Sequence, residues 1–387
     1  MEWKEVTLGD FMQCNPKRTI KKGQKARKIT MDLLIPHSKT IRNWNYEPYS
    51  GGAKFQNGDT IMARITPCLE NGKHAFVSIL DKGEIAYGST EYFVFCGKEE
   101  VSDNDFVYYL TKTPLFRDTA IKSMVGSSGR QRAQMDVLEN LKMLVPKDIS
   151  DQRRIASILS SLDRKIELNN KINADLEEMA QAIFKNWFVD FEPFKDGKFV
   201  DSELGMIPEG WKVGSLGDFC NVFTGKKNTN QAIEKGLYPF FSCAPEPLAS
   251  NDAIFNGKAI IIAGNGSYTG RTSFYNGGFD LYQRTYACTI REQDKENLMI
   301  FFYHMMKQFF EPTKMGGTRG SSIPYIVMGD ITQQKFPYSK DWLIRFSNIA
   351  NSMMDRKLRI DKENSRLSLL RDTLLPRLMS GELEVTE

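Results

Sequence analysis

The sequence predicts an α+β protein in which two similar, mostly-β domains are separated by two long helices. Landmarks of the first half return in the second half, so the chain contains an internal repeat. In each half, a globular pattern is followed by a long segment with helical periodicity. A chain of 387 residues allows two or three domains and a sizeable core without metal or disulfide staples.

The repeat is clearest at the start of each half, where Trp-Lys and Leu-Gly-Asp-Phe occur together. Trp3 returns as Trp211, 208 residues later, and Pro146 parallels Pro337, 191 residues later. Two further matches join the run 58–64 to 257–263 and the run 124–129 to 315–320. The second copy is therefore about 17 residues shorter. The expected parts are domain 1 (1–149), a central helix (150–192), domain 2 (193–340) and a distal helix with the C-terminal tail (341–387).

Short strands are expected in both globular parts. Runs of β-branched and aromatic residues alternate there with Gly, Pro and Asn turns, which is a strand pattern. The runs are Glu84–Tyr87, Tyr92–Phe95, Ala259–Ile262 and Arg284–Ala287. Brief helical patterns lie near Asp105–Leu110 and Leu298–Lys307. These signals predict a small α+β domain that occurs twice.

The first long helix is predicted from Ser150 to Asp190, a segment without Gly or Pro. Its apolar residues recur at alternating steps of four and three, which is the heptad seam of a coiled coil. The seam comprises Ile155, Leu159, Leu162, Ile166, Leu176, Ala180, Ile183 and Trp187. Asn169 and Asn173 fill its gap, where a polar residue typically sets register. About 40 residues would form a helix roughly 60 Å long.

The second long helix is expected near Asp341 to Leu375, with stop signals at Pro376 and Gly381. Its seam, which has an ambiguity of one residue, comprises Phe346, Ala350, Met353, Ile360, Leu367 and Leu374, with Asn364 polar. Two helices of similar length should pair antiparallel and give the fold a pseudo-two-fold repeat. The alternative is that both are ordinary core helices of a bundle.

An aromatic cluster lies near the end of the first long helix. Phe184, Trp187, Phe188 and Phe191 fall within eight residues, more than a coiled-coil pair can bury. Two destinations remain open. Phe184, Trp187 and Phe188 either bind a partner subunit or pack against the second globular part.

A basic run near the N-terminus is a candidate for phosphate contact. It contains seven Lys or Arg in 12 residues and no acid, namely Lys17, Arg18, Lys21, Lys22, Lys25, Arg27 and Lys28. Such a run could neutralise phosphates and make binding salt-dependent. The alternative is a solvated loop. Phosphate contacts would position the protein but would carry no base information.

Base readout needs side chains such as Arg, Lys, Asn or Gln that reach the groove edges. Candidates in the first copy are Arg64, Asn71, Lys73, His74, Ser127, Arg130, Gln131 and Arg132. Candidates in the second copy are Lys226, Lys227, Asn265, Tyr268, Arg271, Arg284 and Arg319. For any one of them an ordinary surface role is the alternative, so the weight lies in the mirrored set.

Motifs for catalysis and metal binding are missing from the sequence. The stretch Gly264–Gly270 is not a dinucleotide fingerprint, and there is neither a phosphate loop nor a nucleophile elbow. Asn15-Pro16-Lys17 lacks the second Pro and the aromatic of the adenine methyltransferase motif. The six cysteines form no Cys-x-x-Cys pair, and there are only three histidines. We therefore expect a binding protein with no catalytic residue and no metal site.

No apolar run of about 18 residues and no signal segment is found, so we expect a cytoplasmic protein without membrane contact. The net charge of +4 is only mildly basic and does not by itself indicate a partner.

The two helical segments also carry a family resemblance. Gln152–Asn169, running on to Ala182–Phe188, is similar to the central conserved region of the specificity subunits of type I restriction-modification systems. Leu374–Leu383 resembles their distal conserved region, and the Trp-Lys and Leu-Gly-Asp pattern at each domain start fits as well. The resemblance covers essentially the whole chain and is weakest in the globular parts.

The resemblance implies two target-recognition domains that each read one half of a bipartite, asymmetric site in double-stranded DNA. The antiparallel helices would fix the spacer between the half-sites. Two methylation subunits would use S-adenosylmethionine, and two motor-nuclease restriction subunits would use ATP and Mg2+. This chain itself would be non-catalytic and hold no cofactor. The alternatives are a stand-alone DNA methyltransferase or nuclease with an unrecognised site, and a coiled-coil scaffold without DNA function.

Overall fold

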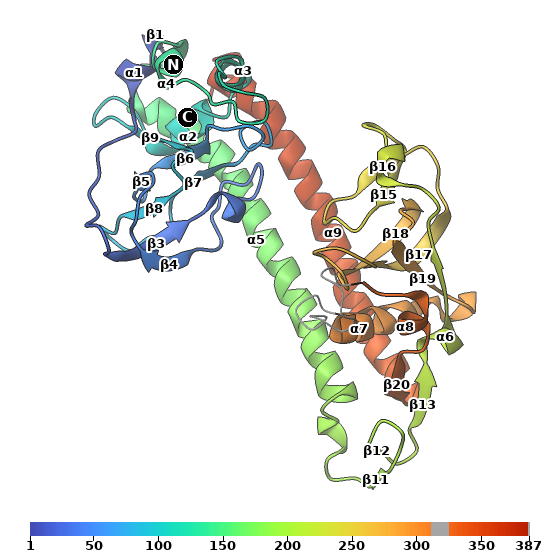
Figure 1. The fold of residues 1–387 in the computed structure, drawn as a ribbon. Helices are drawn as coiled ribbons and strands as arrows, with labels where there is room; N and C mark the ends of the chain where they lie inside the picture. Colours follow the sequence, from blue (N-terminus) through green and yellow to red (C-terminus); the bar gives the residue numbers. More distant parts are fainter. Residues whose placement is uncertain (311–324, 386–387) are drawn as a thin grey trace. The chain divides into compact units, whose positions relative to one another are not determined.

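The computed structural model describes residues 1–310 and 325–385 and consists of two compact units. Unit 1 contains Met1–Lys171 and Ile360–Glu387, and unit 2 contains Ile172–Arg359. Each unit therefore combines one globular part with part of each long helix, as the colours in Figure 1 allow the reader to follow. The four-part division made from the sequence remains a prediction.

Unit 1 is built on two four-stranded sheets. Their orders are β2-β9-β6-β7 and β4-β3-β8-β5, and β1 pairs separately with β10. The strands are β1 (Trp3–Thr7), β2 (Met12–Cys14), β3 (Lys25–Ile29), β4 (Asn45–Pro48), β5 (Lys54–Phe55), β6 (Thr60–Ala63), β7 (His74–Phe76), β8 (Ala86–Gly88), β9 (Tyr92–Gly97) and β10 (Lys142–Pro146). The short helices are α1 (Leu8–Phe11), α2 (Asn104–Leu110), α3 (Pro114–Lys122), α4 (Met135–Glu139) and the 3-10 turn η1 (Met31–Leu33).

Unit 2 gathers its main strands into one six-stranded sheet, ordered β14-β19-β17-β18-β15-β16. The strands are β11 (Phe199–Val200), β12 (Ile207–Pro208), β13 (Lys212–Ser215), β14 (Cys220–Thr224), β15 (Tyr238–Phe241), β16 (Leu248–Ser250), β17 (Phe255–Ala263), β18 (Thr272–Leu281), β19 (Thr285–Ile290) and β20 (Lys335–Tyr338). The short helices are α6 (Leu216–Phe219), α7 (Met299–Phe310), α8 (Met328–Thr332) and the 3-10 turns η2 (Glu192–Phe194), η3 (Thr229–Gln231) and η4 (Gln293–Leu298). The strands and short helices that the sequence predicted lie within or overlap these elements.

The strand register corrects the offset of the repeat. In the antiparallel pair β1–β10 Lys4 faces Val145, and in β13–β20 Lys212 faces Tyr338. Val145 and Tyr338 therefore occupy equivalent places, 193 residues apart, whereas the matched prolines gave 191. The prolines matched by residue type alone, while hydrogen-bond register fixes which residues share a place in a sheet.

The two long helices are α5 (Ile149–Phe188) and α9 (Lys340–Met379), each 40 residues long. In unit 1, Asn169 Nδ2 lies 2.9 Å from Asn364 Oδ1, and Asp163 Oδ1 lies 2.7 Å from Arg371 Nη1. Positions on α5 rise as their partners on α9 fall, so the predicted antiparallel pairing is confirmed in this unit. Asn169 is 1% exposed, and its amide is satisfied across the pair.

The buried residues of α9 show which of the two possible registers its heptad seam follows. Met354 and Leu375 are buried, whereas Met353 and Leu374 are only partly buried. Pro376 lies inside α9 and does not end it, which corrects the expected stop. Pro376 lies near the end of α9. Because proline has no backbone N–H, the helix loses only the hydrogen bond that this residue would donate to the preceding turn. Gly381, with a φ of 77°, follows the helix end instead.

In unit 2 the same two helices pair through aromatic rings. The ring centres of Phe184 and Phe346 are 5.6 Å apart, and those of Trp187 and Trp342 are 5.0 Å apart. Phe184 and Phe188 are 2% and 4% exposed inside the core of this unit, and Trp187 packs against it. These residues therefore pack against the second globular part, which was one of the two alternatives. Phe184 and Phe188 are buried there and cannot contact a partner subunit. Sequence alone left the two destinations open because the core is completed by rings more than 100 residues away.

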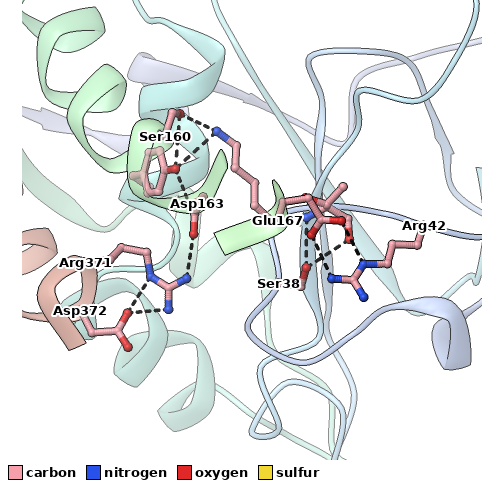
Figure 2. Close-up of polar contacts among 10 residues, drawn as sticks. Ser38, Arg42, Ser160, Asp163, Glu167, Arg371 and Asp372 are labelled. Carbon is pink, nitrogen blue, oxygen red and sulfur yellow. Dashed lines mark hydrogen bonds and ion pairs between the residues drawn. The ribbon is translucent and has the colours of Figure 1, made fainter. Parts of the chain in front are cut away.

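In unit 1 the globular part packs on Ile155, Ala156 and Leu159 of α5, and the polar contacts that Figure 2 shows add to this packing. Lys39 Nζ lies 2.7 Å from Ser160 Oγ and forms an ion pair with Asp105. Arg42 makes two hydrogen bonds to Glu167, at 3.1 and 3.0 Å. These contacts set how the loop after η1 lies against the helix. No helix in residues 1–310 and 325–385 is long and apolar enough to span a membrane.

Candidate nucleic-acid interface

The basic run of unit 1 divides into exposed and neutralised groups. Lys17, Lys21 and Lys22 are exposed between β2 and β3, and Lys25 is exposed at the start of β3. Within the described part of the chain, none of the four forms an ion pair with a carboxylate. Their charges are therefore available to an external anion such as a phosphate, and the phosphate contact itself stays a prediction.

The other basic residues of the run are held inside the unit. The ion pairs are Arg18–Asp59, Arg27–Asp81 and Lys28–Glu47. Arg18 Nε lies 2.8 Å from Asp59 Oδ2, and the Arg18 side chain is 13% exposed. Burial raises the pKa of Asp59, although the guanidinium opposes that effect. Arg18 thus has a structural partner, which argues against its predicted role as a phosphate contact.

Three chain segments of unit 1 meet at one end of the sheet that contains β6 and β9. Arg64 follows β6, and its amide donates to the carbonyl of Glu91 at 2.9 Å, just before β9. The amide of Ala133 donates in turn to the carbonyl of Arg64 at 2.8 Å. Arg132 forms a β-bridge with Ile65. We call Arg64, Glu91 and Arg132 the sheet-end site of unit 1.

The side chains of this site are tied to one another and to the sheet. Arg132 Nε lies 3.0 Å from both oxygens of Glu91, and Arg132 Nη2 lies 2.7 Å from Oε1. The guanidinium beside Glu91 lowers the pKa of that carboxyl. The Arg64 guanidinium lies over the Phe93 ring, 4.7 Å from its centre, and its buried Nε has no hydrogen-bond partner among the described residues.

Other candidates of the first copy lie on nearby loops with different freedom. Ser127, Arg130 and Asn71 are exposed, and Gln131 is partly buried. Lys73 is occupied, since its Nζ donates to the carbonyl of Met31 at 2.6 Å.

His74 contradicts the prediction that it lies on a base-reading loop. It begins β7, is 5% exposed and stacks on Tyr108 with ring centres 4.8 Å apart. Its Nε2 lies 2.9 Å from Thr111 Oγ1, so its polar edge is satisfied internally. Burial holds its pKa well below the ordinary value. A buried histidine in the core cannot reach a DNA groove.

Unit 2 repeats the sheet-end geometry. The amide of Gly264 donates to the carbonyl of Arg284 at 2.9 Å, and that of Ile326 donates to the carbonyl of Gly264 at 2.8 Å. Asn265 bridges Tyr325 just as Ile65 bridges Arg132. Gly264, Arg284 and Tyr325 therefore stand where unit 1 has Arg64, Glu91 and Arg132, and we call them the sheet-end site of unit 2.

This equivalence corrects a second sequence match. Ala63 faces Tyr92 and Ala263 faces Thr285 at the ends of the corresponding strands. The offset is therefore 200, one more than the match of 58–64 with 257–263 gave. A shift of one residue exchanges the two faces of a strand, so the sequence match could not align the side chains of the site.

Side chains around the second site have mixed surroundings. Arg284 is exposed, and no carboxylate pairs with it in the described ranges. Tyr268 is 46% exposed, and the amide oxygen of Asn265 accepts from the Cys243 thiol at 3.0 Å. Arg271 donates to the carbonyl oxygens of Ala244 and Pro245, so it holds the 243–246 loop in place.

The remaining candidates of the second copy differ in availability. Lys226 is exposed. Lys227 lies 2.7 Å from Asp252 and 2.6 Å from Asp280, so two carboxylates neutralise its charge and argue against a phosphate contact. Arg319 lies outside the described residues.

Sequence reasoning missed residues that shape both sites. Glu91 orients Arg132, Phe93 carries Arg64, and Cys243 links its loop to Asn265. Only the repeat, aligned with its true register, could have pointed to Glu91, because it stands at the place of Arg284. All six cysteines are unpaired, and the described residues contain no cluster of potential ligands that could hold a metal ion.

Comparison with known proteins finds a matching family and relatives that align with most of the chain. A family model described as the type I restriction modification DNA specificity domain matches residues 1–178 and 208–340. The MjaIX specificity subunit of Methanocaldococcus jannaschii is 28% identical over 305 residues, which cover 73% of this chain and 70% of that protein. The HindI specificity subunit of Haemophilus influenzae is 24% identical and covers 99% of this chain and 100% of its own length.

A solved structure shares the fold. The S subunit of a type I restriction-modification system from M. genitalium superposes with a TM-score of 0.55 at 16% identity, covering 100% of this chain and 97% of that one. The family regions include the sheet-end sites of both units. The chain therefore belongs to the family of type I restriction-modification DNA specificity proteins.

Proposed function

We propose that this chain is the DNA-reading, non-catalytic subunit of a type I restriction-modification complex. The observation that carries the proposal is that the family match falls on both globular parts, each with its own sheet-end site. Each unit would read one half of a bipartite, asymmetric site in double-stranded DNA.

The lysines and the arginines would have different roles in DNA binding. The four exposed lysines of unit 1 are suited to phosphates, because compact ammonium groups on mobile stems need no fixed geometry. The arginines of the sheet-end sites are suited to base edges, since guanidinium groups offer directed donors. Binding should therefore weaken steeply with salt through the lysines, while sequence preference depends on the arginines.

The long helices would set the spacer between the half-sites. Both α5 and α9 contribute residues to both units. Inserting matched helical turns in both helices should change the number of base pairs between the half-sites and leave the half-site sequences intact. An unchanged spacer in such a variant would contradict this role.

Methylation subunits would dock on the long helices and supply the S-adenosylmethionine chemistry, and motor-nuclease subunits would use ATP and Mg2+. Exposed apolar residues on the unit 1 portions of the helices support such docking, because Leu168, Leu369 and Leu370 are 54%, 70% and 47% exposed. Leu369→Asp with Leu370→Asp should abolish co-purification with a methylation subunit and leave the fold intact by circular dichroism. Retained co-purification would exclude this surface.

The direct test compares the modified bases of host DNA with the gene present and with it deleted. We expect one bipartite methyladenine motif to disappear on deletion. If no such motif is lost, the modification role is wrong. Methyl transfer or DNA cleavage by the purified chain alone, with S-adenosylmethionine or a divalent metal, would instead favour a stand-alone enzyme.

A further inference from the structure

We propose that Arg132, positioned by Glu91, and Arg284 each read a guanine, one in each half-site. The inference rests on the proposed function and assigns the specificity-determining residue of each unit. It follows from the sheet-end site to which each side chain belongs, although the two stand at different positions of the repeat, and from the donors that each leaves available.

Arg132 keeps the donors that a guanine requires. The Glu91 carboxylate takes its Nε and one N–H of Nη2, and the carbonyl of Arg130 accepts one N–H of Nη1 at 3.2 Å. One N–H on each Nη has no partner among the described residues. Two donors on adjacent nitrogens suit the O6 and N7 acceptors of guanine in the major groove. The Arg132 side chain is 41% exposed, so a base edge can reach it.

Glu91 makes Arg132 a better reader of bases than of phosphates. The carboxylate offsets the charge of the guanidinium, which weakens attraction to a phosphate, while the fixed fork keeps its direction. The backbone of Arg132 is also fixed, because its amide donates to Val125 at 2.9 Å and its carbonyl accepts from Val125 at 3.0 Å. A side chain held at both ends loses little freedom when it binds.

Arg284 belongs to the sheet-end site of unit 2 but occupies a different position from Arg132. It stands where unit 1 has Glu91, and its carbonyl accepts from Gly264 at 2.9 Å and from the Cys243 thiol at 3.3 Å. A Cβ on Gly264 would collide with that carbonyl and with the Tyr286 ring. Unit 2 therefore has no counterpart of Arg64, and Arg284 is the exposed guanidinium of its site. Without a carboxylate beside it, we expect Arg284 to discriminate less sharply and to depend more on salt.

The test uses the whole complex in its host and reads the methylated motif by sequencing. Arg132→Ala should make one G·C position of one half-site degenerate, with discrimination at that position falling about 5- to 150-fold. Arg284→Ala should do the same at one position of the other half-site. Glu91→Gln should relax the same position as Arg132→Ala, and Glu91→Asp should partly restore it. Glu5→Gln, which removes the exposed partner of Lys142 in the same unit, is the matched control and should change nothing.

Position dependence separates reading from a structural role. If Arg132→Ala and the charge-preserving Arg132→Lys both leave every position intact, or lower methylation evenly at all positions, the inference is overturned. The failure of the proposed function looks different, because the unaltered protein would then yield no bipartite motif at all.

Discussion

The two units share a backbone plan and an apolar helix core but differ in the groups that add to that packing. Unit 1 packs Leu159 and Leu375 in its apolar core and adds a buried ion pair, in which Asp163 and Arg371 lie 2.7 Å apart with side-chain exposures of 6% and 8%. Unit 2 uses rings, with Phe184 and Phe346 at its centre. Both packings therefore rest on apolar contacts. The ion pair of unit 1 requires its buried charged groups to be satisfied, whereas the aromatic rings of unit 2 depend on shape and buried area.

The sheet-end sites differ in the same manner. In unit 1 the arginine is fixed by a carboxylate, and Arg64 rests on Phe93. In unit 2 the Tyr286 ring lies beside Gly264, the counterpart of Arg64. The Tyr286 hydroxyl donates to the carbonyl of Ile326 at 3.1 Å. The repeat thus preserves backbone hydrogen bonds and varies side chains at the same places, which is what two readers of different sequences need.

The largest expected effect comes from breaking the charged pairing of unit 1. Arg371→Ala should destabilise this unit by about 3 to 5 kcal/mol, because it leaves Asp163 buried without its cation. Hydrogen exchange should show lost protection in α2 and the first half of α5. Protection in α7 of unit 2 should remain, and equal losses in both units would refute the separation of the two packings.

A pH change should reveal the contribution of a buried histidine in unit 2. His304 is buried in unit 2, its Nδ1 lies 2.9 Å from Gln181 Oε1, and burial lowers its pKa from 6.5 to about 4. The folded unit keeps the ring neutral, while the unfolded chain binds a proton below pH 6.5. Stability should therefore fall between pH 6.5 and 4, by up to about 3 kcal/mol.

Denaturant unfolding across this pH range measures the effect. His304→Gln should flatten the pH dependence of unit 2 only, since His74 gives unit 1 a loss of the same sign. If the variant keeps the full dependence, a group other than His304 is responsible.

The smallest effect is expected at the exposed clamp of unit 1. Arg42 and Glu167 are 40% and 33% exposed, so Arg42→Ala should cost less than about 1 kcal/mol. Chemical denaturation at low and high salt measures this, and the cost should shrink with salt. A cost as large as that of Arg371→Ala would mean that exposure does not rank these contacts.

Much of the fold could be predicted because it follows from local pattern. The heptad steps of α5 and the repeated Trp-Lys start lie in the sequence itself. The side-chain partners could not be predicted, since they come from distant segments. Glu91 is 41 residues from Arg132, and Asp280 is 53 residues from Lys227.

Candidate residues failed where burial decided the outcome. His74 was a candidate for base readout and Phe184 for partner binding, yet each is buried in a core. The exposed lysines and Arg284 kept the freedom that the sequence suggested, because no carboxylate from elsewhere in the described residues reaches them.

The central claim is that each unit reads its own half of one DNA site. The most direct test replaces residues 212–340 with the corresponding segment of another specificity protein and sequences the methylated bases of the host. We predict that one half-site changes while the other half-site and the spacer remain. A change in both half-sites, or in neither, would contradict the claim.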